Sequence, residues 1–174
     1  MKRIIIIGLT IVFAAISAKL QAQSTETTSA DAQIVAPISI SETASLNFGT
    51  MSSSGTVGTL TLSTTGVKLA TGGVNTSSQS PLASNAVYTV GGAINTTYII
   101  TLPPSITVSN GTPADDMIIN ALLARTASAG ADGLTGTLGA TGFDTFSIGG
   151  TLNVAASQTT GAYTGVFSVT VAYN

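Results

Sequence analysis

The residue types that carry most enzyme chemistry are absent from this sequence, and the acidic groups that remain are dispersed. Without His, Cys or Trp, the chain has no imidazole base, thiol nucleophile, disulfide or His/Cys zinc site. Asp115 and Asp116 are adjacent, so on a strand they would face opposite ways and could not share a proton. A calcium site using Asp115, Asp116 and Asp132 would need roughly six to eight oxygen ligands, and no loop supplies ligands at alternating positions. We therefore expect no catalytic, metal or cofactor site and no enzymatic activity.

Composition excludes further classes of partner. Charged residues make up 7% of the 174 residues, against about 25% in typical soluble proteins. The five Lys and Arg residues provide no basic surface for nucleic acid. Hydrophobic residues account for 44% of the chain, which is enough for one folded domain of ordinary size.

The N-terminus is typical of an exported protein. A positive start, Met1-Lys2-Arg3, is followed by an apolar run over residues 4–18 and then by polar residues. This pattern predicts a signal peptide at residues 1–22, cleaved after Ala22, with Ala18 as the second choice. The run is shorter than the about 20 residues of a membrane span. We expect export through the periplasm to the cell surface or medium, with no membrane span after cleavage.

The mature chain is predicted to begin with a flexible tail, residues 23–31, followed by a single domain, residues 32–174. From Ala32 to Ser41 apolar and other residues alternate, as in a strand. Pro37 lies on the opposite face and removes one ladder hydrogen bond. This segment is a candidate donor strand, with one apolar face formed by Ala32, Ile34, Ala36, Ile38 and Ile40.

Further alternating segments, separated by Gly, Ser and Asn clusters, predict many short strands and hence a β-sandwich. Ala114–Ala124 fits a helix or a strand, and the glycines at every third position from Gly130 to Gly142 predict an irregular connection. Turns are expected at Ser52–Gly55, Thr71–Gly73 and Gly149–Gly150. The other expected strands are Val57–Ser63, Ala86–Gly91, Thr97–Leu102, Ser105–Ser109, Thr145–Gly149, Thr151–Ala155 and Tyr163–Tyr173.

The last of these strands has the most regular alternation. Over eleven residues its side chains divide into one apolar and one mainly polar face. Such a strand is either central to a sheet or unpaired along one edge and able to take a neighbour. Its apolar face is Tyr163, Phe167, Val169, Val171 and Tyr173.

Several motifs recur in a fixed order along the mature chain. They are Ala36–Ile40 with Leu46–Met51, Tyr88–Gly92 with Thr97–Pro103, and Phe146–Leu152 with Gly161–Asn174. Together they resemble a bacterial exported family known as domain of unknown function 4402. The Leu46-Asn47-Phe48-Gly49 element and the penultimate Tyr173 also resemble pilins of the chaperone–usher type. That second resemblance implies an immunoglobulin-like β-sandwich lacking its last strand, which a neighbour's donor strand completes.

Two functions are weighed on these grounds. The first is a structural subunit of a bacterial surface fibre or adhesive layer, self-associating by β-strand addition, with a periplasmic chaperone and an outer-membrane usher as partners implied by the resemblance. The alternative is a self-complete secreted β-sandwich that binds a ligand such as a glycan. A small outer-membrane barrel ranks lower because aromatic girdles are lacking. The sequence leaves open whether Ala32–Ile40 completes its own fold or a neighbour's.

Overall fold

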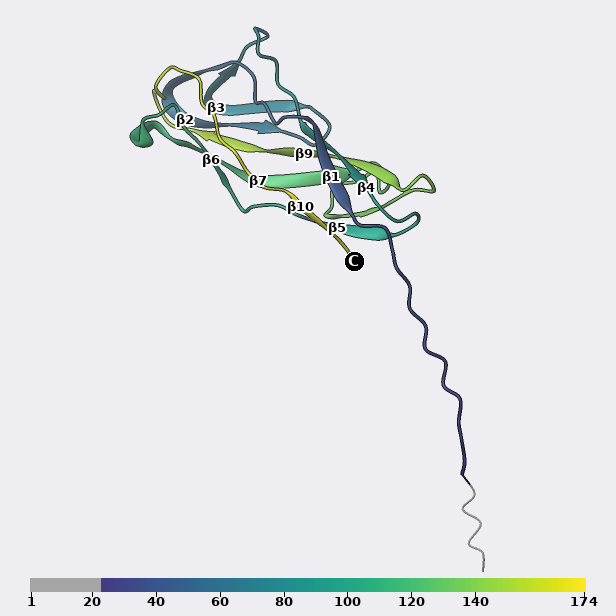
Figure 1. Ribbon diagram of the computed structural model, residues 1–174. Helices are drawn as coiled ribbons and strands as arrows, with labels where there is room; N and C mark the ends of the chain where they lie inside the picture. Colours follow the sequence, from purple (N-terminus) through teal and green to yellow (C-terminus); the bar gives the residue numbers. More distant parts are fainter. Residues whose placement is uncertain (1–22) are drawn as a thin grey trace, which may run out of the picture. The chain divides into compact units, whose positions relative to one another are not determined.

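The structure is a computed structural model that describes residues 23–174 (Figure 1). The predicted signal peptide lies outside the described residues. Residues 23–33 are exposed and carry no strand. Ile34–Asn174 form one compact unit.

This unit is all-β, as the alternation predicts. One short 3-10 turn, η1 (Pro113–Asp115), precedes β7. The strands are β1 (Ser39–Ala44), β2 (Met51–Leu62), β3 (Lys68–Thr76), β4 (Ala86–Gly91), β5 (Thr97–Thr101), β6 (Ile106–Val108), β7 (Met117–Thr126), β8 (Thr135–Thr137), β9 (Phe143–Val154) and β10 (Thr170–Tyr173).

The larger sheet is built around β9, the long central strand in Figure 1. One edge of β9 pairs with β7, while its other edge pairs first with β4 and then with β2. β1 extends the sheet beyond β4, and β3 extends it beyond β2. β9 thus pairs with three strands, β2, β4 and β7, and so fixes the register of the central part of this sheet.

The smaller sheet has the order β10-β5-β8 and packs on the larger one as a β-sandwich. All pairings in both sheets are antiparallel. The interior divides into two clusters. One is formed by Phe48, Leu60, Leu62, Val74, Ile106, Met117, Ile119, Leu152 and Val154; the other by Ala86, Tyr88, Val90, Tyr98, Ile100, Ala124, Leu138, Phe146 and Ile148.

Three turns predicted at glycine or serine clusters are wrong. Ser52–Gly55 lies within β2, Thr71–Gly73 within β3 and Gly149–Gly150 within β9. At Gly149 a side chain would collide with the Leu62 carbonyl of the neighbouring strand. Here glycine permits close approach of two backbones rather than a change of direction.

Strand pairing determines the structure of two segments that the sequence left open or predicted as irregular, Ala114–Ala124 and the glycine-rich connection from Gly130 to Gly142. Most of Ala114–Ala124 is strand, because β7 pairs with both β6 and β9. The glycine-rich connection contains the short strand β8, where Gly136 lies against the Tyr98 ring. A Cβ at Gly136 would stand 2.5 Å from that ring, so this glycine is needed for packing.

The C-terminal strand is shorter than predicted. Its ladder runs only from Thr170 to Tyr173, on β5, and one isolated bridge joins Thr164 to Ser109. Between these points the segment has no continuous partner strand, because Pro103-Pro104 separate β5 from β6. Proline has no N–H to donate to a ladder.

Candidate strand-addition site

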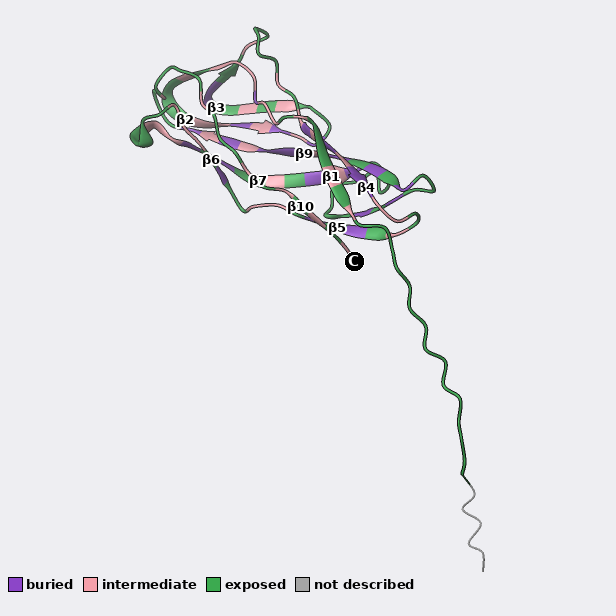
Figure 2. Ribbon diagram, in the orientation of Figure 1, coloured by how far each residue is buried: buried purple, intermediate pink, exposed green. Residues whose placement is uncertain are grey.

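The alternating N-terminal segment is only partly incorporated into its own domain. Ala32, Ile34 and Ala36 are exposed, with Ile34 at 98%, and the chain that leads into β1 is drawn as exposed in Figure 2. Strand pairing begins only at Ser39. The other two residues of the predicted apolar face, Ile38 and Ile40, are half-buried against the second core cluster. The segment therefore has one half fixed to its own fold and one half with its apolar side chains in water.

In the C-terminal segment, half-buried and exposed residues alternate. All five residues of the predicted apolar face are half-buried, and residues between them on the other face are exposed. Tyr163 and Phe167 pack on the first cluster, while Phe167 also packs on the second. Val169, Val171 and Tyr173 pack on the second cluster alone. The C-terminal segment thus packs on both core clusters, but its apolar side chains stay partly exposed to solvent.

These two segments meet where both sheets end. β1 is the edge strand of the larger sheet and β10 the edge strand of the smaller one. Tyr173 Oη donates to the Ala36 carbonyl at 2.6 Å and accepts from the Ala93 N–H at 2.7 Å. The half-buried apolar residues on this side form what we call the apolar seam: Ile38, Ile40, Phe167, Val169, Val171 and Tyr173. Two free strand edges beside incompletely buried apolar groups are the features required for strand addition.

The carboxylates considered for calcium are not brought together. Asp132 accepts from Thr64 Oγ1 at 2.6 Å and lies 3.9 Å from Arg125. Asp115, the last residue of η1, instead accepts from Asn110 Nδ2. Within residues 23–174 no group of three acidic side chains is placed to hold a metal ion.

Among residues 23–174, the one acidic residue that is buried, Asp144, is held in a network of hydrogen bonds. Asp144 is 8% exposed and accepts from Tyr98 Oη at 3.0 Å and from Ser128 Oγ at 2.6 Å. The N–H groups of Ser128 and Thr145 donate to its second oxygen. Burial raises the pKa of Tyr98, and the hydrogen bond to Asp144 and its negative charge raise that pKa further. This network ties β5 to β9 and to the loop after β7.

We expect Tyr98→Phe to flatten the loss of stability at alkaline pH. Because the pKa of Tyr98 is raised in the folded state, the unfolded chain loses the Tyr98 proton at a lower pH than the folded chain does. The contribution of Tyr98 to the free energy of unfolding is therefore fully present below about pH 10 and decreases as the pH rises above that value. The variant should also lose about 1–3 kcal/mol at neutral pH with the hydrogen bond to a charged acceptor. Urea unfolding from pH 8 to pH 11 measures both effects. If the variant loses stability with rising pH as steeply as the wild type does, groups other than Tyr98 control the alkaline loss of stability.

Comparison with known proteins places the chain in a family. A family model described as a domain of unknown function (DUF4402) matches residues 38–173, and the chain belongs to that family. A search of curated proteins finds no match. In the described part of the chain, no helix has the length and apolar character needed to cross a membrane.

Proposed function

We propose that this protein is a structural subunit of a bacterial surface fibre or adhesive layer, and that its copies associate by β-strand addition. The observation that carries the proposal is the coexistence of an exposed segment of alternating sequence at residues 32–37 with an apolar seam between two free strand edges. The free segment of one copy pairs along the edge of the C-terminal strand of the next copy.

The energetics favour this pairing. Burying Ile34 alone contributes about 1.5–3 kcal/mol, and each new backbone hydrogen bond adds about 0.5–1.5 kcal/mol. The seam residues of the accepting copy would gain burial at the same time. The fifteen residues 23–37 can span up to about 50 Å when extended, so a neighbouring domain is within reach.

The same proposal covers export and partners. The predicted signal peptide would direct the chain to the periplasm. Before assembly, an incompletely buried apolar seam and two free edges carry a risk of aggregation. We therefore propose that a periplasmic chaperone shields the seam and that an outer-membrane usher organises assembly at the cell surface.

Removing the free half of the segment tests the proposal. The chain lacking residues 1–22 should form SDS-resistant oligomers or fibres, visible by gel electrophoresis and electron microscopy. The chain lacking residues 1–37 should retain β1, fold, and remain monomeric. A synthetic peptide of residues 32–41 should raise its melting temperature.

A self-complete binding module would behave differently. Both chains would then be monomers of equal stability, and the peptide would have no effect. A scrambled peptide of the same composition is the control for non-specific apolar binding. Equal oligomer formation by the two chains would contradict the role assigned to residues 32–37.

A further inference from the structure

An exposed aromatic ring lies at one end of the outer face of the larger sheet. Phe143 begins β9 and is 60% exposed, whereas Asp144 and Phe146, which point to the opposite face, are buried. The ring rests against Gly91 of β4, where an added Cβ would stand 3.0 Å from a ring carbon. Gly91 thus provides the space in which the ring is held, while the rest of the ring remains open to solvent.

Beside this ring is a row of hydroxyl groups. Ser41 pairs with Thr89, and Thr89 pairs with Thr145, across β1, β4 and β9. These residues lie two positions from the Ser39–Gly91–Phe143 row, so their side chains point to the same face as Phe143. Among the described residues, none of the three hydroxyls has a side-chain hydrogen-bond partner.

The other half of this face is different. There Thr59 Oγ1 lies 2.7 Å from Thr71 Oγ1, and Thr61 Oγ1 lies 3.0 Å from Thr151 Oγ1. These threonines satisfy one another across the strands. The free hydroxyl donors and acceptors are therefore concentrated next to Phe143.

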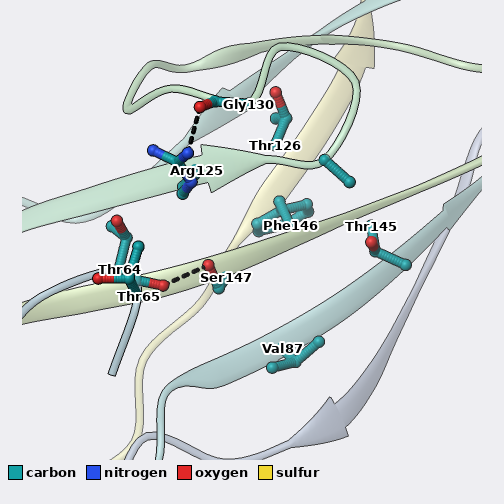
Figure 3. Close-up of a pocket in the computed structure, with 10 residues that line it drawn as sticks. Thr64, Thr65, Val87, Arg125, Thr126, Gly130, Thr145, Phe146 and Ser147 are labelled. Carbon is teal, nitrogen blue, oxygen red and sulfur yellow. Dashed lines mark hydrogen bonds between the residues drawn. The ribbon is translucent and has the colours of Figure 1, made fainter. Parts of the chain in front are cut away.

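Thr145, at one end of this row, also lines an open cavity of about 410 Å³ (Figure 3). Ser147, Arg125 and Val87 line it as well. Ser147 Oγ donates to the Thr64 carbonyl at 2.7 Å, so this hydroxyl offers a ligand an acceptor and not a free donor. The Arg125 guanidinium donates to the Gly130 carbonyl and lies 3.9 Å from the Asp132 carboxylate. The nearby Asp132 carboxylate thus offsets the Arg125 charge at the cavity, and Thr and Ser side chains line the cavity together with apolar Val87 and Ala127.

We infer that this strip, formed by Phe143, Ser41, Thr89, Thr145 and Ser147, binds a neutral linear polysaccharide. A sugar ring has an apolar C–H face that packs on an aromatic ring and hydroxyls that exchange hydrogen bonds with Ser and Thr. The strand spacing of about 4.8 Å is close to the length of one sugar unit, and Phe143 to Ser147 spans about 13 Å along β9. The absence of a dominant charge at the cavity favours a neutral over an acidic chain. The strip shares no residue with the apolar seam.

Affinity electrophoresis of the chain lacking residues 1–22 tests the inference. Native gels would contain hydroxyethyl cellulose, laminarin, dextran or galactomannan, with polygalacturonate as the acidic comparison. At least one neutral polysaccharide should retard the protein more strongly than polygalacturonate does. Retardation by polygalacturonate alone, or by none of the five, would overturn the inference.

Variants assign the binding to the strip. Phe143→Ala should lower the affinity derived from the retardation roughly tenfold, as expected when a central aromatic contact is truncated. Phe143→Tyr should preserve that affinity. Thr145→Ala should weaken it less, and Thr61→Ala, on the same face in the other half, should leave it unchanged. Circular dichroism checks that each variant is folded. Equal retardation of wild type, Phe143→Ala and Thr145→Ala would contradict the assignment even if the protein binds polysaccharide.

Discussion

Val169→Asp should prevent folding of the isolated domain or lower its unfolding free energy by about 3 kcal/mol. Val169 is half-buried and packs on the second core cluster, where a carboxylate would lose hydration without gaining a partner. A loss of this size is a large part of the about 5–15 kcal/mol that stabilises an ordinary domain. Urea unfolding followed by circular dichroism measures the change.

The matched control is Val166→Asp. Val166 belongs to the same segment, but it is 95% exposed on the opposite face. Its substitution should change the unfolding free energy by no more than about 0.5 kcal/mol. If the two variants are equally stable, the C-terminal segment does not cover the core with the face described here.

Ile34→Asp should abolish assembly while leaving the fold intact. The Ile34 side chain is 98% exposed in the single chain, so its replacement costs the monomer little. In the proposed assembly the same side chain is buried against the seam of the next copy, where an unpaired charge is strongly unfavourable. Sedimentation and electron microscopy should show monomers in place of oligomers.

Val35→Asp is the control for this variant. Val35 is also exposed, at 47%, but alternation turns it to the other face of the segment. It should still assemble. Loss of assembly in both variants would indicate a general effect of charge, and assembly of both would exclude Ile34 from the contact.

Much of the fold follows from alternation alone. The predicted bounds of β4, Ala86–Gly91, agree with the structure, because its run of residues that favour strands ends at the glycines Gly91 and Gly92. β3 was missed because glycines at 72 and 73 resemble a turn. In the structure Gly73 is instead buried against the Thr56 carbonyl of β2, a contact between residues distant in sequence that local patterns do not contain.

In the candidate site, local alternation assigns each side chain to a face but does not give the extent of strand pairing. In the C-terminal segment alternation puts Phe167, Val169 and Val171 on one face and Val166 on the other. The first three are half-buried and Val166 is exposed. How far each segment is paired depends on its neighbours. Pro103-Pro104 interrupts the partner of the C-terminal segment, and β4 supplies an edge for β1 only from Ser39.

The outer strip was also missed, and a signal for it was present. The strand predicted from the sequence begins at Thr145, two residues after Phe143. Alternation within that predicted strand therefore does not assign the Phe143 side chain to a face. Extending the alternation back through Asp144 places Phe143 outward, with Thr145 and Ser147. Its contact with Gly91 depends on the pairing of β4 with β9.

Disulfide mapping between two copies tests strand addition most directly, because the sequence has no cysteine. The chain lacking residues 1–22 and carrying Val35→Cys is mixed under oxidising conditions with chains carrying Val166→Cys, Ser168→Cys or Thr61→Cys. A disulfide requires Cα atoms within about 7 Å, so linked dimers report adjacent strands. The account predicts mixed dimers with Val166→Cys or Ser168→Cys and none with Thr61→Cys, on the larger sheet. Failure of both C-terminal variants to link, or equal linkage to Thr61→Cys, would contradict it.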